Sequence, residues 1–205
     1  VEGSTQYDSF ESETIVIAKA IKMEPMIDRE DNYQGEKRVE LHAHTKMSAM
    51  DGLNEVENLV EISAKWGHKA VAITDHGVVQ SFPDGAKRAD ELAAKGIDIK
   101  VIYGLEGYVF DDTDMHSEDG KIDYKSKPTN HIILLAKNQE GLKNIYKLVS
   151  LSHLNYFYKK PRLPKSVITK HREGIIIGSA CEAGEVFRAV VAGKPDEEIK
   201  KIASF

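Results

Sequence analysis

From residue 38 onward, short apolar segments alternate with helical patterns, and this alternation restricts the possible folds more than any other feature of the sequence. The apolar segments are predicted strands, at residues 39–41, 69–74, 99–103, 131–136 and 174–178. Apolar side chains recur at helical spacing between them, and Gly67 and Gly96 are the predicted ends of the first two helices. Apolar strands that alternate with helices favour a parallel sheet covered by helices, as an open sheet or a barrel.

The first 23 residues show a different pattern. Residues 1–7 and 13–23 are predicted to be two strands on either side of a polar turn, because apolar and polar side chains alternate over residues 14–18. Two strands alone are marginally stable in water, so we expect this hairpin to belong to a sheet whose other strands are missing. The polar residues 28–37 have the composition of a linker.

Charge and cysteine content limit the partners of the chain. A net charge of −5 means that the surface as a whole should not attract phosphate backbones. Contact with DNA would therefore need a local basic patch, bound cations or parts of a larger chain. A single cysteine excludes an internal disulfide framework and favours a reducing cytoplasm. No apolar run approaches the ~20 residues of a membrane span, so we expect no membrane partner.

Side chains that can bind metals follow four of the predicted strands. His42 and His44 follow the first, His76 the second, Glu106 the third and Cys181 the last. The carboxyl ends of parallel strands meet at one edge of a sheet, and a His-x-His spacing in extended chain puts both rings on one face. Imidazole, carboxylate and thiolate are ligands of zinc and related divalent ions. The sequence therefore predicts a metal site at this edge.

The order and spacing of these residues resemble the motifs of the polymerase and histidinol phosphatase (PHP) family. The motifs are His-x-His at 42–44 with Ser48 and Asp51-Gly52, Thr-Asp-His at 74–76, Gly-Leu-Glu at 104–106, residues 131–138, and Gly-Ser-Ala-Cys at 178–181. The resemblance implies an α/β fold, a PHP-type distorted (β/α)7 barrel that is incomplete at the C-terminus here. It also implies up to three divalent metal ions, zinc and/or manganese. The ligands carried over are His42, His44, Asp51, His76, Glu106, His131 and Cys181.

Simpler interpretations apply to some of these residues. His131 stands at the start of its strand, so only the resemblance makes it a ligand. Cys181 alone would more often be a small buried hydrophobe, but its position after Gly-Ser-Ala at a strand end favours metal. Asp75 is expected either to orient an imidazole from outside the ligand set or to accept backbone hydrogen bonds. Residues 156–162 mix aromatic and basic side chains, which would suit single-stranded nucleic acid, but a packed loop with a solvated basic face is the preferred interpretation. Surface or helix-cap positions are expected for His68, His116, His153 and His171.

Within the family, residues 37–45, 65–84, 135–153 and 162–181 look most like PolC-type DNA polymerase III alpha subunits. In that class an OB-fold domain precedes the PHP domain. Residues 1–27 are therefore expected to be the C-terminal strands of an OB-fold, residues 28–37 a linker and residues 38–205 the PHP domain. The class also carries an exonuclease between the Glu and His motifs, where only residues 111–130 stand here, so that insert is naturally absent or removed. The family's closing Asp-x-His motif has no match after Cys181.

The resemblance implies two roles, a structural brace for the polymerase and a metal-dependent 3′–5′ exonuclease. Paired divalent ions would activate a water and stabilise charge on the scissile phosphate, so no side chain is assigned as catalytic. The expected partners are DNA at the primer 3′ end, the rest of the polymerase chain and replisome proteins. DNA polymerisation (nucleotidyl transfer) would be an activity of the whole polymerase, outside these residues. The alternatives are a small-molecule phosphoesterase such as a histidinol phosphatase, and a non-catalytic domain stabilised by metal.

Overall fold

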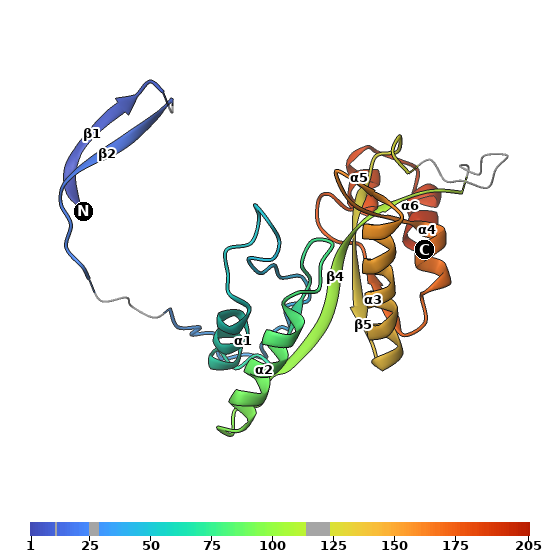
Figure 1. Cartoon of the computed structure of the whole chain (residues 1–205), viewed down its shortest axis with the longest axis horizontal. Coiled ribbons are helices and arrows are strands. Elements are labelled where there is room, and N and C mark those ends of the chain that lie inside the picture. The colour runs from blue at the N-terminus through green and yellow to red at the C-terminus, as the bar shows by residue number, and fades with distance from the viewer. Residues whose placement is uncertain (11, 25–28, 114–123) are drawn as a thin grey trace. The chain divides into compact units, whose positions relative to one another are not determined.

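The computed structural model describes residues 1–10, 12–24, 29–113 and 124–205. The chain divides into two compact units, Val1–Asn32 and Tyr33–Phe205 (Figure 1). The division lies within the predicted linker, residues 28–37. His116 and the middle of the polar segment 111–130 lie outside the described residues.

The first unit is a two-stranded antiparallel hairpin, as the alternation predicts. Strand β1 (Glu2–Asp8) pairs with strand β2 (Glu13–Ala20), with Thr5 opposite Val16. Both Val16 and Ile17 are exposed. The described part of this unit therefore has no buried apolar core of its own.

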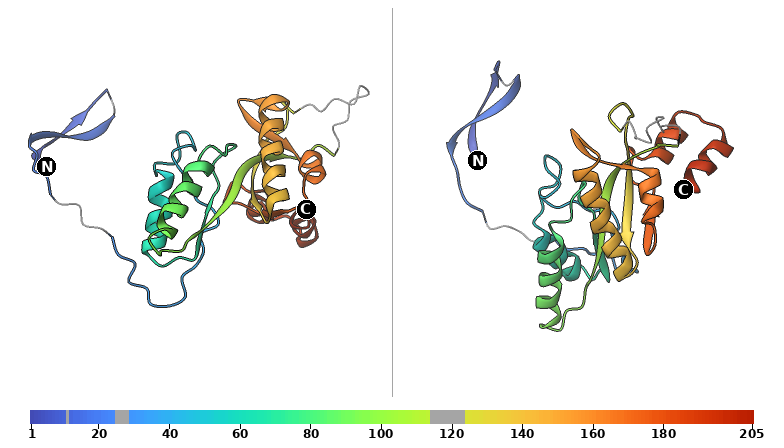
Figure 2. Two further views of the ribbon diagram at one scale, coloured as in Figure 1. Left: turned by 60° about the horizontal axis from the view of Figure 1, so that its bottom comes forward. Right: turned by 45° about the vertical axis from the view of Figure 1, so that its right-hand side comes forward.

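The second unit is built around a mixed sheet. Its strands are β3 (Ala70–Ile73), β4 (Lys100–Phe110), β5 (Asn130–Ala136), β6 (Phe157–Tyr158), β7 (Lys160–Pro164) and β8 (Ile175–Gly178). The order is β6-β7-β4-β5-β8, and β3 pairs with the first part of β4. The long strand β4 runs through the middle of the unit (Figures 1 and 2). As far as the chain is described, the sheet is open.

The direction of β5 corrects the expectation of a parallel sheet. β5 runs antiparallel to both β4 and β8, whereas β3 and β7 run parallel to β4. A parallel pair needs a crossover, usually a helix, and the described residues between β4 and β5 form none. The chain therefore turns back on itself. As a result the start of β5 lies beside the end of β4, with His131 opposite Tyr108.

Other elements differ from the predictions in extent. Residues 39–41 form no strand, only a single bridge between Glu40 and Val71. Strand β4 continues through Gly104 and Gly107 to Phe110, whereas the predicted strand ended at residue 103. A Cβ at Gly104 would lie 2.6 Å from Leu135 Cδ2, so this glycine allows a neighbouring side chain to pack closely. Strands β6 and β7 and helix α4 (Lys165–Lys170) were not predicted.

The helices cover the sheet in two groups. Helices α1 (Val56–Lys65) and α2 (Phe82–Ala93) pack on β3 and β4, and α3 (Gln139–Leu154) packs on β5 and β7. Gly67 and Gly96 follow α1 and α2 with φ of 79° and 78°, which confirms the predicted helix ends. The chain ends with helices α5 (Glu185–Val191) and α6 (Asp196–Ala203). None of the helices in the described ranges has the length and apolar character that a membrane span requires.

Two main apolar cores result. Val60, Val71 and Ile73 belong to the core beneath α1 and α2. Leu134 and Leu148 belong to the core beneath α3. Strand β4 contributes side chains to both, so it connects the two cores within one sheet.

Candidate metal centre

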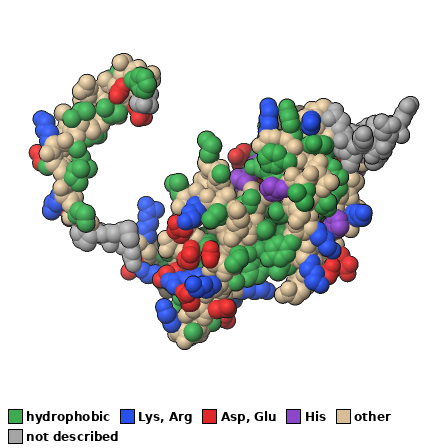
Figure 3. All heavy atoms as spheres, viewed as in Figure 1, with side chains coloured by type: hydrophobic (Ala, Val, Ile, Leu, Met, Phe, Trp, Pro, Cys, Tyr) green, Lys and Arg blue, Asp and Glu red, His purple; other side chains and the backbone are tan. Residues whose placement is uncertain are grey.

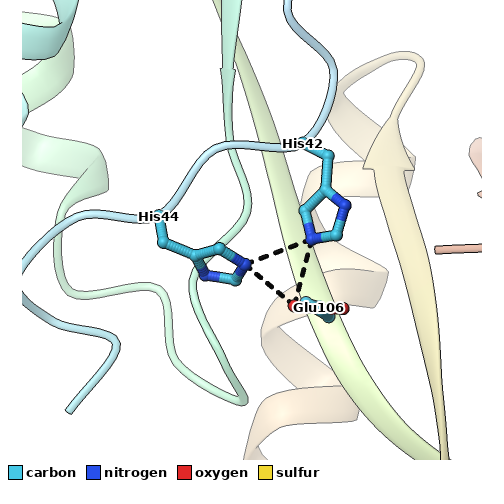
Figure 4. Close-up of side chains that lie close together, drawn as sticks. All are labelled: His42, His44 and Glu106. Carbon is cyan, nitrogen blue, oxygen red and sulfur yellow. Dashed lines mark hydrogen bonds and ion pairs between the residues drawn. The ribbon is translucent and has the colours of Figure 1, made fainter. Parts of the chain in front are cut away.

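His42 and His44 lie in the loop that leads from the Glu40 bridge to α1, and both rings point toward Glu106 on β4 (Figure 4). Their Nε2 atoms lie 3.1 and 2.9 Å from Glu106 Oε2 and 3.1 Å from each other. A hydrogen bond donated to the Glu106 carboxylate raises the pKa of His42, although burial opposes the shift. The predicted His-x-His pair therefore converges on the predicted glutamate.

Glu106 is the centre of the cluster. Its side chain is only 1% exposed, and the Oε1 and Oε2 atoms lie within 3.2 Å of nitrogens from four imidazoles. Burial alone would raise the pKa of Glu106, but hydrogen bonds with His131, His42 and His44 hold it well below its usual range. Glu106 is therefore a buried carboxylate that remains ionised at neutral pH.

His76 and Asp51 extend the cluster on one side. His76 follows β3, where a bridge to Glu106 fixes its backbone, and its Nε2 lies 2.9 Å from Asp51 Oδ2. Its ring stacks on His44 with 4.3 Å between centroids. Burial lowers the pKa of His76, which favours the neutral imidazole that can bind a metal.

His131 and Cys181 complete the cluster from the C-terminal half. His131 Nδ1 lies 2.9 Å from Glu106 Oε1. Cys181 Sγ lies 3.9 Å from His131 Nδ1 and 3.9 Å from Glu106 Oε1. His131 reaches the site from the start of its strand because β5 is antiparallel to β4. Burial raises the pKa of Cys181, and the charge of Glu106 raises it further. Without a cation nearby, the thiol is therefore protonated.

The arrangement fits bound divalent ions. In the described part of the chain, ligand atoms lie within 4.8 Å of one another in three overlapping groups: His42, His44 and Glu106; His44, Asp51 and His76; His76, Glu106 and His131. Atoms that each lie about 2.0–2.2 Å from one ion are roughly 3 Å apart, as the Glu106 contacts are. His76 Nδ1 is buried and, among the described residues, makes no hydrogen bond of acceptable geometry, although Glu106 Oε2 lies 3.2 Å away. A cation would satisfy this nitrogen.

Unusual backbone conformations lie beside two of these residues. Met50 and Ala180 have φ of 64° and 60° and directly precede Asp51 and Cys181. Such non-glycine residues store roughly 1–3 kcal/mol of strain and gather at functional sites. In the first loop, a Cβ on Gly52 would lie 1.9 Å from the Thr45 carbonyl oxygen. The loop that presents Asp51 is therefore closed too tightly for any residue but glycine at position 52.

Asp75 contacts the imidazoles only indirectly. The buried carboxylate accepts hydrogen bonds from Thr45 N and Oγ1, Ser48 Oγ and Ser81 Oγ at 2.7–2.8 Å. Ser48 Oγ also lies 2.8 Å from His44 Nδ1 and accepts a hydrogen bond from His76 N. Because Ser48 donates its only proton to Asp75, it accepts from His44 Nδ1–H. With a cation bound, this tautomer would leave His44 Nε2 free to act as a ligand beside Glu106.

The sequence did not assign this role to Ser48. The only signal was a serine inside the first motif, and a serine in a polar loop is too common to be informative. Asp75 combines both expected roles, since it orients an imidazole through Ser48 and accepts a backbone bond from Thr45.

The remaining histidines stay outside the cluster as far as the structure describes them. His153 lies in the last turn of α3, where its Nδ1 contacts the Val149 carbonyl, and His171 is the C-cap of α4. His68 follows α1. The loop predicted for residues 156–162 is wrong as to secondary structure, because Phe157–Tyr158 and Lys160–Pro164 pair as the β6–β7 hairpin. The basic residues and the prolines at 161 and 164 gave this segment no alternation of apolar and polar side chains that would predict strands.

Comparisons with known proteins agree with this geometry. The DNA polymerase III PolC-type of Clostridium perfringens is 29% identical over an alignment of 394 residues, covering 100% of this chain and 27% of the relative. The Bacillus subtilis PolC-type polymerase is 26% identical, covering 99% and 27%. The chain thus spans about a quarter of the length of these relatives. Since it has 205 residues, the 394-residue alignment also shows that the Clostridium protein carries inserted residues within the matched span.

Two solved structures align with part of the chain. A putative metal-dependent phosphoesterase from Bifidobacterium adolescentis aligns with a TM-score of 0.35 and 18% identity over 56% of this chain and 32% of that chain. An amidohydrolase from Chromobacterium violaceum aligns with a TM-score of 0.35 and 19% identity over 54% and 32%. The PHP domain family itself matches residues 40–205, which include every residue of the cluster. The chain belongs to the PHP domain family.

Proposed function

We propose that residues 38–205 are the PHP domain of a PolC-type replicative polymerase, with a multinuclear metal centre that hydrolyses phosphodiesters at a primer 3′ end. The observation that carries the proposal is the buried, ionised Glu106 surrounded by four imidazoles. We expect up to three divalent ions, zinc and/or manganese. The proposed ligands are His42, His44, Asp51, His76, Glu106, His131 and Cys181.

Bound cations would supply Lewis acidity and an activated water. The residues of the chain do the rest. Glu106 provides the central negative charge, and the Ser48–Asp75 hydrogen bonds hold His44 in the tautomer that leaves Nε2 free. Asp51, whose side chain is 55% exposed, stands at the solvent side of the cluster. Figure 3 shows histidine side chains at the surface of this unit. The side chains of His42, His44 and His76 are 26%, 19% and 17% exposed, so a substrate can approach them from solvent.

The wider setting is part of the same proposal. We infer that residues 1–27, which include the β1–β2 hairpin, are the last strands of an OB-fold. We also infer that residues 28–37 are the linker and that the PHP domain is a barrel-type fold. We infer that the relatives' inserted residues are an exonuclease missing at residues 111–130. DNA, the rest of the polymerase chain and cytoplasmic replisome proteins would be the partners, and nucleotidyl transfer would belong to the whole polymerase.

The test uses the full-length polymerase with a paired or a mismatched primer terminus. Metal-dependent removal of the mismatched nucleotide should disappear in His44→Ala while polymerisation continues. His153→Ala, which changes a histidine on α3 outside the cluster, is the matched control and should behave as the unmodified enzyme does. Excision by His44→Ala at the unmodified rate would refute the proposal.

The second candidate is a metal with a purely structural role. It is favoured because residues before strand β4 and residues after it contribute to one cluster, so a bound ion would hold them together. In that case elemental analysis would find metal in the unmodified protein, and the protein would melt at a lower temperature without it. No excision would occur with any metal. Hydrolysis of a phosphomonoester but not of the primer would instead indicate a small-molecule phosphatase.

A further inference from the structure

The β6–β7 hairpin, formed by Phe157–Tyr158 and Lys160–Pro164, lies against the metal centre. Gly77 directly follows His76, and a Cβ at this glycine would lie 2.4 Å from Pro161 Cγ. The hairpin therefore packs on the backbone next to a proposed ligand. β7 also pairs with β4 at Tyr108, two residues beyond Glu106.

Lys160 brings a positive charge close to the cluster. Its Nζ lies 4.2 Å from the centroid of the Tyr108 ring, which in turn stacks on His76 at 5.6 Å and an interplanar angle of 10°. Among the described residues no ion pair joins Lys160 to a carboxylate, and the neighbouring charges that act on it are cationic. Burial lowers the pKa of Lys160, and the charges of Arg162 and Arg188 lower it further. A partly buried ammonium without an anionic partner suits a phosphate group.

The rest of the hairpin presents aromatic faces among cations. Phe157 and Tyr158 are 50% and 36% exposed. Lys159 Nζ lies 5.5 Å from the Tyr158 ring, and its backbone φ of 61° forms the turn. Non-glycine residues rarely adopt this conformation, and when they do it is often at binding sites.

The buried Arg162 fixes the hairpin in place. Its guanidinium donates hydrogen bonds to the carbonyl oxygens of Tyr124, Lys127 and Tyr158. The aromatic side chains therefore stand on an anchored element. This is the combination of stacking surfaces and backbone-tracking charge that binds single-stranded nucleic acid.

We propose that the β6–β7 hairpin binds the single strand that enters the metal centre, with a phosphate on Lys160 and a base stacked on Tyr158, which pairs with Lys160 and lies on the same face of the hairpin. This inference rests on the proposed function, because it names where that substrate is held. It also supplies the local basic patch that a chain of net charge −5 needs to bind DNA.

The first experiment measures binding of a short fluorescein-labelled oligothymidylate to this chain by fluorescence anisotropy. Lys160→Gln should lower the slope of log Kd against log salt concentration by about 0.7, as expected when one phosphate contact with a single strand is lost. The control Lys100→Gln changes an exposed lysine at the other end of β4, and its salt dependence should equal that of the unmodified chain.

A second variant separates stacking from charge. Tyr158→Leu keeps an apolar side chain but removes the aromatic face, and binding should weaken roughly five- to 150-fold. Poly-glutamate, which has charge but no bases, should compete poorly and should bind Tyr158→Leu as it binds the unmodified chain. Unchanged oligonucleotide binding in folded Lys160→Gln and Tyr158→Leu would overturn the inference, as would equal binding of poly-glutamate.

Hydrolysis of bis(p-nitrophenyl) phosphate by the unmodified chain with manganese tests the metal centre separately. If this diester is hydrolysed but the oligonucleotide does not bind through the hairpin, the inference fails and the proposed function stands. If the oligonucleotide binds through the hairpin but neither the diester nor the primer is hydrolysed, the proposed function fails and the binding surface stands.

Discussion

Replacing Ser48 with alanine tests whether a hydroxyl outside the ligand set positions the metal centre. Ser48 is fully buried, and its Oγ makes three contacts: it donates to Asp75 Oδ1 at 2.7 Å, lies 2.8 Å from His44 Nδ1 and accepts from His76 N at 3.1 Å. Ser48→Ala removes all three without adding bulk. His44 then loses the acceptor that fixes its tautomer.

Two magnitudes follow. The buried His76 N–H loses its partner, which costs about 1–3 kcal/mol, and the hydrogen bond to the Asp75 carboxylate contributes about 1.5–3 kcal/mol more. We therefore expect the free energy of unfolding of the metal-free protein to fall by roughly 2.5–6 kcal/mol. Partners that orient metal ligands typically change affinity 10–100-fold, so zinc or manganese should bind about 1.4–2.7 kcal/mol more weakly.

The assay is competition for metal against a chromophoric chelator, with urea unfolding measured in parallel. Ser63→Ala is the matched control, since Ser63 is also buried but donates only to the Leu59 carbonyl within α1. It should lose about 1 kcal/mol of stability and no metal affinity. If Ser48→Ala remains folded and binds metal as tightly as Ser63→Ala does, the positioning role is refuted.

Three further changes give distinct outcomes. Glu106→Gln removes the group that raises the pKa of His42, so in metal-free protein that pKa should fall toward its ordinary value in an NMR titration; an unchanged value would contradict the assignment. The raised pKa of His42 stabilises the fold at pH values below the pKa of His42 in the unfolded chain, and this stability is lost as the pH rises through the pKa in the folded protein. Glu106→Gln should therefore also reduce the loss of folding stability that occurs above about pH 6.5. Cys181→Ser should weaken zinc binding more than manganese binding, because thiolate is the softer ligand, and an unchanged affinity ratio would exclude the thiol from the ligand set. Gly52→Ala should lower the melting temperature more than Gly96→Ala does. At Gly96 the added Cβ meets no atom within 4 Å, and only the positive φ is unfavourable. Equal decreases in melting temperature would mean that the close contact with the Thr45 carbonyl does not restrict position 52 to glycine.

The sequence predicted the parts of this molecule that depend on local pattern. Gly67 and Gly96 ended helices because only glycine adopts positive φ readily, and this is visible from the residue alone. The His42 and His44 pair was recognisable because a spacing of two keeps both rings on one face. The convergence of Asp51, His76 and Glu106 on these histidines followed from strand order and the family motifs.

Features that depend on pairing between distant segments could not be predicted. Apolar periodicity is the same for either strand direction, so it could not show that β5 returns antiparallel and brings His131 to Glu106. The β6–β7 hairpin is held by the pairing of β7 with β4 and by Arg162, and neither leaves a local pattern. Ser48 acquires its role only when Asp75 and His44 meet it in three dimensions.

Strand β4 contributes to both apolar cores, and the proposed ligands come from the chain on both sides of this strand. His42, His44 and His76 come from chain before β4, while His131 and Cys181 come from chain after it. Glu106, near the middle of β4, touches residues from both groups. A cation held there would act as a cross-link between the two halves of the domain, in addition to the continuous strand β4. Hydrolysis and the mutual orientation of the halves would then depend on the same ion.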